Sequence, residues 1–351
     1  MKIILDAMGG DKAPLEVVKG AVMAKNAYDI SLTLVGNKKI ITRVAKENGL
    51  SLDGIDIVHT EEVITMEDDP MSVIRAKKNS SMAVGLRMLK EEGDAFVSAG
   101  NTGALHAGSS LIIRPIKGIQ RAAIATVLPL AKPMLMLDCG ANTTVTPHYL
   151  MQWAVMGSIY MKNIFEIDSP AVGLLNNGAE EHKGTPVAAE AHKLLRDNPE
   201  IWFIGNVEGT QIVQSPCDVL VTDGFTGNIT LKLIEGMGKF FMHSLKGMYK
   251  TNAMTKMSFF VMKEHLRSFK KQFDASEHGG APLLGLRKPV IKAHGSSDAA
   301  AIANAIRQAI AFVRTGVIDE ISEYVRTATP TLGAHSVAST VKSEENTDEQ
   351  G

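Results

Sequence analysis

The chain of 351 residues is poor in cysteine, in aromatic side chains and in net charge. Its two cysteines, Cys139 and Cys217, exclude a disulfide framework and a four-cysteine zinc site. Aromatic residues make up 5% of the chain, which argues against base stacking as the main activity. The formal net charge of −1 gives no overall attraction to nucleic acid or to a membrane, so any such attraction has to come from a local patch.

Long apolar runs are also missing. No stretch approaches the roughly eighteen uncharged apolar residues that a membrane-spanning helix needs. The chain begins with only three apolar residues between Lys2 and Asp6, which is too few for a signal peptide, so we expect a cytoplasmic protein. At 45% hydrophobic residues, the chain can form a core that needs neither disulfides nor metal.

What the chain does contain is a repeating unit of a short apolar run, a glycine-rich turn and a helical segment. This alternation predicts an α/β fold, a three-layer sandwich with a mostly parallel sheet between two layers of helices. The predicted strands cover residues 2–6, 32–35, 55–59, 94–98, 134–138, 171–175, 201–204 and 218–222. The predicted helices cover residues 14–25, 38–47, 72–92, 186–195 and 299–313.

We expect one catalytic domain over residues 1–335, with two segments that differ from it. Residues 239–285 are predicted to form a basic helical excursion, because Lys239–Lys271 holds eight Lys or Arg residues and a single acidic one, Glu264. Residues 336–351 are predicted to be a disordered acidic tail, because their last nine residues contain four acidic side chains and nothing apolar.

The turns that follow the strands are rich in glycine and in short polar residues. Glycine lets the backbone approach a ligand, and amide groups at a helix start favour an anion. Any one such turn is explained more simply by helix capping. We expect seven of these turns to lie together on one edge of the sheet, which favours a phosphate-binding crevice. The predicted binding residues are Asp6, Gly9, Gly10, Asp11, Ser98, Asn101, Thr102, Gly103, Asn142, His182, Asp223, Thr226, Gly227, His294, Ser296 and Ser297.

Cofactor motifs are absent. The sequence has no G-x-G-x-x-G after the first strand, no G-x-x-x-x-G-K-[ST] and no H-E-x-x-H, so we predict neither a nucleotide cofactor nor zinc. Four acidic residues near strand ends are possible Mg²⁺ ligands, although hydrogen bonds that shape the loops explain them more simply. They are Asp6, Asp138, Glu208 and Asp223.

Candidates for covalent catalysis are weak. There is no G-x-S-x-G motif, and Cys139 is more simply a small core residue than a reactive thiol. If the enzyme moves an acyl group, the bound phosphate can be the nucleophile. The most concentrated polar chemistry lies in the loop 176–185, where Lys183 offers a cation for phosphate or an oxyanion and His182 offers a proton shuttle. A solvated charged loop is an equally good interpretation of these residues.

Five motifs in order along the chain resemble those of the bacterial phosphate acyltransferases of phospholipid synthesis (the PlsX family). They are Leu5–Pro14, Ser98–Ala104, His182–Gly184, Thr222–Asn228 and Ile291–Asp298. The resemblance extends over about residues 1–330. It implies a fold similar to that of isopropylmalate dehydrogenase and phosphate acetyltransferase.

The same resemblance implies an activity. Acyl-acyl carrier protein and inorganic phosphate would give acyl phosphate, which feeds a membrane glycerol-3-phosphate acyltransferase. It also implies a homodimer, no cofactor, no nucleic-acid partner and a cytoplasmic enzyme that associates peripherally with the membrane. The family's lysine and asparagine at the reaction centre map onto Lys183 and Asn228.

The basic segment carries an apolar stripe at helical spacing: Phe259, Met262, Leu266, Phe269 and Phe273. Lys263 and Arg267 flank it, as expected of a helix that lies on an anionic membrane surface. The resemblance favours membrane contact through Phe259, Met262, Lys263, Leu266 and Arg267. Dimer packing and docking of the acidic carrier protein remain open for the same stripe.

Two rival functions stand beside the acyltransferase. One is a dehydrogenase of the related fold, for which the sequence offers no nucleotide motif. The other is a non-catalytic membrane scaffold for lipid-synthesis enzymes, which rests on the basic stripe alone.

Overall fold

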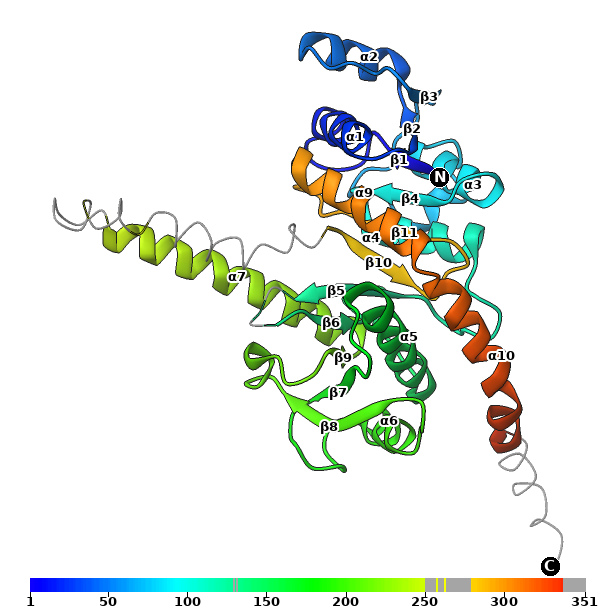
Figure 1. Cartoon of the computed structure of the whole chain (residues 1–351), viewed down its shortest axis with the longest axis vertical. Helices are drawn as coiled ribbons and strands as arrows, with labels where there is room; N and C mark the ends of the chain where they lie inside the picture. The colour runs from blue at the N-terminus through cyan, green and yellow to red at the C-terminus, as the bar shows by residue number, and fades with distance from the viewer. Residues whose placement is uncertain (129, 131, 250–256, 258–261, 263–278, 337–351) are drawn as a thin grey trace, which may run out of the picture.

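A large mixed sheet forms the centre of the molecule in the computed structural model, which describes residues 1–128, 130, 132–249, 257, 262 and 279–336. Helices cover both faces of the sheet, so the predicted three-layer α/β fold is confirmed (Figure 1). Within the described ranges the strands are β1 (Lys2–Asp6), β2 (Ser31–Gly36), β3 (Ile55–His59), β4 (Ala95–Ser98), β5 (Ala123–Leu128), β6 (Met134–Leu137), β7 (Ala171–Asn176), β8 (Trp202–Glu208), β9 (Val219–Val221), β10 (Ala281–Leu284) and β11 (Val290–Lys292).

The helices lie on two faces. One face carries α1 (Leu15–Ala27), α5 (Pro147–Phe165), α6 (Pro186–Arg196), α9 (Ala299–Arg314) and α10 (Val317–Ser336), whose buried residues share one core. The other face carries η1 (Pro70–Val73), α3 (Ser81–Glu91), α4 (Thr102–Gly108) and η2 (Ser109–Ile113), and the first turns of α7 (Gly224–Tyr249) pack there too. α2 (Lys38–Glu47) adds Ile41 and Ala45 to the first core, and η3 (Ile212–Gln214) adds Ile212 to the second.

The strand order divides the sheet into two halves that run in opposite directions. The order is β3-β2-β1-β4-β11-β10-β5-β6-β9-β7-β8. Pairing is parallel within β3-β2-β1-β4-β11 and within β6-β9-β7-β8, but β10 and β5 join the halves through three antiparallel pairs. An odd number of reversals leaves β6, β7, β8 and β9 antiparallel to β1, β4 and β11.

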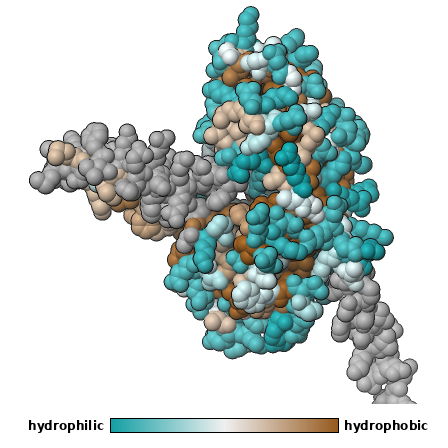
Figure 2. All heavy atoms as spheres, in the orientation of Figure 1, coloured by the Kyte–Doolittle hydropathy of each residue, from teal (hydrophilic) through white to brown (hydrophobic). Residues whose placement is uncertain are grey.

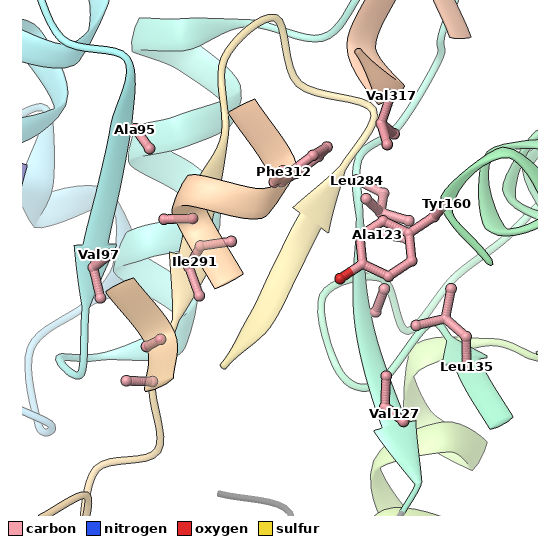
Figure 3. Close-up of a cluster of buried hydrophobic side chains, with 14 of the residues drawn as sticks. Ala95, Val97, Ala123, Val127, Leu135, Tyr160, Leu284, Ile291, Phe312 and Val317 are labelled. Atoms are coloured by element: carbon pink, nitrogen blue, oxygen red, sulfur yellow. The ribbon is translucent and has the colours of Figure 1, made fainter. Parts of the chain in front are cut away.

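The core is continuous across this join. Figure 3 shows Leu284 of β10, Ala123 of β5, Phe312 of α9 and Tyr160 of α5 in one buried cluster. The rings of Tyr160 and Phe312 meet edge to face with centroids 5.8 Å apart, and the Tyr160 hydroxyl accepts a hydrogen bond from Gln308. The two halves therefore share one hydrophobic core.

Some predicted elements have different bounds. The predicted helix 72–92 is wrong over residues 72–80, because Ser80 caps α3 by accepting a hydrogen bond from the Ala83 amide, so that the helix starts at Ser81. The predicted strand 201–204 continues through Gly205 and Asn206 to Glu208. Strands β5, β10 and β11 were not predicted.

The segment 239–285 is described only in part. Its first residues continue α7 to Tyr249, and its last residues form β10 inside the sheet rather than a helical excursion. Among the described residues, no helix is both long enough and apolar enough to cross a lipid bilayer. Of the predicted membrane-contact residues, Met262 is described as helical and exposed, while Phe259, Lys263, Leu266 and Arg267 lie outside the described residues. The predicted tail lies outside them too, apart from Ser336 at the end of α10.

Candidate functional site

The predicted binding loops separate into two groups, because the two halves of the sheet run in opposite directions. The carboxyl ends of β1, β4 and β11 lie on one edge, and the carboxyl ends of β6, β7 and β9 lie on the other. The expectation that all the loops share one edge is therefore wrong. The first group holds Asp6, Gly9, Gly10, Asp11, Ser98, Asn101, Thr102, Gly103, His294, Ser296 and Ser297. The second group holds Asn142, His182, Lys183, Asp223, Thr226, Gly227 and Asn228.

The first group is joined by hydrogen bonds between its loops. The buried Asp6 carboxylate accepts from the Ser98 hydroxyl at 2.8 Å, and the Ser98 oxygen accepts from the Gly100 amide at 3.0 Å. The Asp11 amide donates to the Gly295 carbonyl at 2.8 Å, which ties the loop after β1 to the loop after β11. A cavity of about 260 Å³ opens here, lined in part by Gly10, Asp11 and Gly100.

Polar side chains of the first group are largely engaged within the protein. The Asn101 oxygen caps α4 by accepting from the Ala104 amide, and its amide group donates to three carbonyls of the 65–68 segment. His294 accepts from the Ser296 amide through Nδ1. A larger hollow of about 1050 Å³, between α5, α10 and residues 197–202, contains none of the predicted site residues.

Lys292 is a buried cation in the first group that sequence reasoning did not select. It is the last residue of β11, it is 9% exposed, and its ammonium donates to the carbonyl oxygens of Ala99 and Ala293. Burial lowers the pKa of Lys292 to about 8, and the nearby Asp6 and Asp11 oppose this shift. The only signal in the sequence was a lysine at the end of an apolar strand.

This lowered pKa predicts a stability difference that depends on pH. In the unfolded chain the pKa of Lys292 is 10.5, against about 8 in the folded protein. Between about pH 8 and pH 10.5 the unfolded chain therefore holds the proton more tightly than the folded protein does. The free energy of unfolding of the wild type should accordingly rise with pH over this interval relative to Lys292→Met, by at most about 3 kcal/mol. Urea unfolding of both proteins at several pH values measures this difference, and parallel pH curves would contradict it.

The second group is organised around Asp138, which directly follows β6 and is fully buried. Its carboxylate accepts from the amides of Ile124, Ala141 and Asn142 and from the side chain of Asn142. Burial raises the pKa of Asp138, and the hydrogen bonds from Asn142 and the amides oppose the rise. Asn142 is held at the same time by the Ala122 carbonyl, so its side chain shapes the loop.

The N-terminus of α7 packs directly on this loop. Asp223 accepts from the amides of Phe225 and Thr226 and from the Thr226 hydroxyl, so it caps the helix. A side chain at Gly227 would collide with the Asp138 carbonyl, which brings helix and loop into contact. Asn228 then lies against Gly140, where φ is +130° and an added Cβ would be 2.7 Å from Asn228 Nδ2. The absence of a side chain at Gly140 therefore leaves the space that the Asn228 amide occupies.

The loop 177–185 approaches the same edge from the neighbouring strand. β7 and β9 are adjacent and parallel, so the loop after β7 and the start of α7 leave the sheet side by side. His182 and Lys183 are exposed in this loop, and the aliphatic stem of Lys183 lies over Gly178. Lys183 and Asn228 therefore belong to elements that follow two adjacent parallel strands at the same edge of the sheet.

The structure also bears on the possible metal ligands and on one residue that the sequence analysis did not select. Among the described residues, no three or more His, Cys, Asp or Glu side chains gather in a way that could hold a metal ion. His106 of α4 was missed by sequence reasoning. Burial lowers its pKa, while Asp138 of the second group raises it.

Cys139 is a core residue, as its sequence context suggested. It is 6% exposed, its thiol contacts the Met136 carbonyl at 3.3 Å, and burial raises its pKa to about 12. Cys139→Ala should therefore keep wild-type kcat within about twofold, because a thiol with this pKa holds almost no thiolate at neutral pH. Steady-state rates of the two proteins measure this, and a loss of activity without a loss of folded protein would contradict it.

Comparisons with known proteins agree with this architecture. Among solved structures, the chain is similar to a phosphotransacetylase from Streptococcus pyogenes, with a TM-score of 0.63 and 20% identity over 89% of this chain and 94% of that one. It is also similar to a putative 4-hydroxythreonine-4-phosphate dehydrogenase from Salmonella typhimurium, with a TM-score of 0.51 and 12% identity over 89% and 98% of the two chains. At these identities the likeness defines the fold alone: that of the phosphotransacetylases and related dehydrogenases.

Sequence relatives define the family. The chain matches the model of the fatty acid synthesis protein family over residues 1–320. It is 47% identical over 327 residues to a phosphate acyltransferase of Alkaliphilus oremlandii, which covers 93% of this chain and 97% of that protein. It is 41% identical over 328 residues to a phosphate acyltransferase of Clostridioides difficile, with coverage of 93% and 96%. The chain belongs to the fatty acid synthesis protein family, and it is an acyltransferase enzyme.

Proposed function

We propose that this protein transfers a fatty acyl group from the thioester of acyl carrier protein to inorganic phosphate, giving acyl phosphate and the free carrier thiol. The proposal rests on the topology of one sheet edge, where the loop with Lys183 and the helix start with Asn228 follow two adjacent parallel strands. A cation and an amide donor are the groups that an anionic nucleophile and a developing oxyanion need. The relatives named phosphate acyltransferase support phosphate as the acceptor.

In this mechanism a phosphate oxygen attacks the thioester carbonyl carbon directly. The new C–O bond forms as the carbonyl π electrons move onto oxygen. The C=O bond then re-forms from that electron pair as the C–S bond breaks, and the C–S electron pair leaves on sulfur. Lys183 orients the phosphate and neutralises the oxyanion, and Asn228 donates to the same oxygen. His182, next to Lys183, provides the proton for the departing thiolate. No acyl-enzyme is needed, because holding both substrates in place supplies much of the acceleration.

Thiol release from a long-chain acyl carrier protein, measured with and without phosphate, tests this function. Two rivals make different predictions. A dehydrogenase of the same fold would reduce NAD in the presence of a hydroxy acid, and we expect no absorbance change in that assay. A scaffold without catalytic activity would tolerate substitutions at Lys183 and Asn228.

The exposed face of α7 supports two assembly proposals. Phe225, Ile229, Leu233, Met237 and Phe240 recur at spacings of three and four residues, and each is at least 42% exposed. The helix extends away from the body of the molecule, and apolar residues lie on its surface (Figures 1 and 2). We infer that this face packs against a second copy of the chain in a homodimer. The basic segment that follows would contact the membrane near a glycerol-3-phosphate acyltransferase, or dock the acidic carrier protein.

Membrane contact can be separated from dimer packing. Replacing Phe259 and Met262 by glutamate should abolish binding to anionic liposomes, because two charges in an apolar stripe oppose its burial in the lipid interface. Flotation with liposomes measures the binding, and sedimentation of the same variant verifies that the dimer persists. Unchanged flotation would favour dimer packing as the role of the stripe.

A further inference from the structure

The backbone that carries Lys183 is held by side chains from outside its loop. The Lys183 amide donates to the Glu180 carbonyl at 3.1 Å, which closes a turn over residues 180–183. The same carbonyl accepts a second hydrogen bond, at 2.8 Å, from Nδ2 of Asn206 on β8. Asn206 therefore hydrogen-bonds to the Glu180 carbonyl, the same group that closes the turn leading to Lys183.

The other end of this turn is held by the strand before it. Asn176, the last residue of β7, donates through Nδ2 to the Lys183 carbonyl at 3.0 Å. Its side-chain oxygen accepts from the Asn177 amide at 2.8 Å. The carbonyl groups of residues 180 and 183 are thus both held by asparagine side chains, one from β7 and one from β8.

Asn206 is itself oriented by a buried histidine. Nδ1 of His192 lies 3.0 Å from Oδ1 of Asn206, and His192 is 5% exposed on α6. Because Nδ2 of Asn206 donates to Glu180, Oδ1 is the end that accepts, so His192 carries its proton on Nδ1. The imidazole packs edge to face on Phe203 with ring centroids 5.0 Å apart, which fixes its orientation.

A bulge in β8 brings these groups to one face. Phe203 and Asn206 are three residues apart, and on a regular strand they would point to opposite faces. The register between β7 and β8 shifts so that Val172 pairs with Phe203 while Gly173 pairs with Gly205, which leaves Ile204 as an extra residue. Gly205 has φ of +98°, a backbone conformation suited to such a shift. The extra residue turns Asn206 onto the face of Phe203, against His192 and the loop.

We propose that Asn206 is a positioning residue for the reaction, which holds the Glu180–Lys183 turn so that the Lys183 ammonium faces the reaction centre. This rests on the proposed catalytic role of Lys183. His192 and the bulge at Gly205 contribute indirectly, because they orient the Asn206 amide that holds the turn. The loop without this support would still carry Lys183, but in many orientations, and misplacement of a catalytic group by about 1 Å can lower the rate by about a hundredfold.

Asn206→Asp tests the proposal with an isosteric change. A carboxylate cannot donate to the Glu180 carbonyl, so we expect kcat to fall about 10- to 100-fold while KM for the acyl carrier protein changes less than about threefold. If the aspartate variant does not fold, Asn206→Ser is the second test. It removes the same donor without adding charge, so it should lower kcat by a similar factor. Asn198→Asp is the matched control, since Asn198 is also half-buried and bonded at both ends of its amide, to Tyr324 and Glu200.

A double-variant experiment asks whether Asn206 acts through Lys183. In the Lys183→Ala background, single-turnover rates should show no further loss on adding Asn206→Asp, because there is no ammonium left to position. A further 10-fold loss there, or a normal kcat for Asn206→Asp alone, would overturn the positioning role. Near-normal turnover of Lys183→Ala by itself would instead overturn the proposed mechanism, so the two failures are distinguishable.

Discussion

Replacing Lys183 by alanine is expected to lower kcat for acyl transfer about 100- to 1,000-fold while the protein stays folded. The ammonium is proposed to orient phosphate and to neutralise the oxyanion, and the loss of one such group in a preorganised site typically has this effect. The side chain is exposed, and its ammonium makes no hydrogen bond or ion pair with another described residue, so its removal should cost little stability. Steady-state kinetics with varied phosphate measure the effect.

Lys193→Ala is the matched control for this prediction. Lys193 is an exposed lysine on α6, ten residues further along the chain, and it pairs with Glu190 at 3.7 Å. Its loss should leave kcat unchanged, because surface ion pairs of this kind contribute little to stability and none to the site. Equal rates for the two variants would show that Lys183 is an ordinary surface lysine of a solvated loop.

The Asn228→Ala variant is expected to lower kcat by a similar factor, about 100-fold or more, with little change in KM for phosphate. Its amide is proposed to donate only to the oxygen that becomes negative in the transition state, so its loss affects the chemical step rather than binding. Asn228→Asp should be at least as inactive, because a carboxylate would face the developing negative charge.

Folding of the Asn228 variants needs its own check, since α7 begins on the Asp138 loop. Thermal unfolding should give a Tm close to that of the wild type, because Asn228 is only half-buried. Lys232→Ala, on the next turn of α7, serves as the control and should retain full activity. If Lys232→Ala also lowers kcat, the loss in the Asn228 variants would come from a disturbed helix rather than from a lost hydrogen-bond donor.

Local patterns in the sequence predicted most of the strands and the turns that follow them. Apolar runs such as Lys2–Asp6 and Ala171–Leu175 are long enough to identify a buried strand, and the glycines after them mark where each strand ends. The helix 299–313 was predicted within one residue at its end, because Asp298 caps it and its apolar residues recur at helical spacing.

The division of the site into two groups could not be predicted in this way. It depends on β5 and β10, whose antiparallel pairing reverses the second half of the sheet, and strand direction leaves no mark on local hydrophobicity. The strand β10 has four residues and contains Pro282, so it resembled the end of the basic segment rather than a strand. The place of Asn206 depends on a bulge, which a short run such as Trp202–Ile204 does not reveal.

Some side-chain roles within the site could be predicted from the sequence and others could not. Capping by Asn101 and Asp223 agrees with the simpler interpretation of these residue types at helix starts. Lys292 could not be selected, because its burial follows from the packing of loops after three different strands. The catalytic roles of Lys183 and Asn228 stay predictions, supported by the position of their elements after adjacent strands at one edge of the sheet.

The most direct test of the central claim is to incubate the protein with a long-chain acyl carrier protein and phosphate, and to trap the acyl product with hydroxylamine. The account predicts that thiol release requires phosphate, that acyl hydroxamate forms in equal amount, and that Lys183→Ala and Asn228→Ala slow both about 100-fold or more. Release of thiol without phosphate, or no hydroxamate from folded protein, would contradict acyl transfer to phosphate.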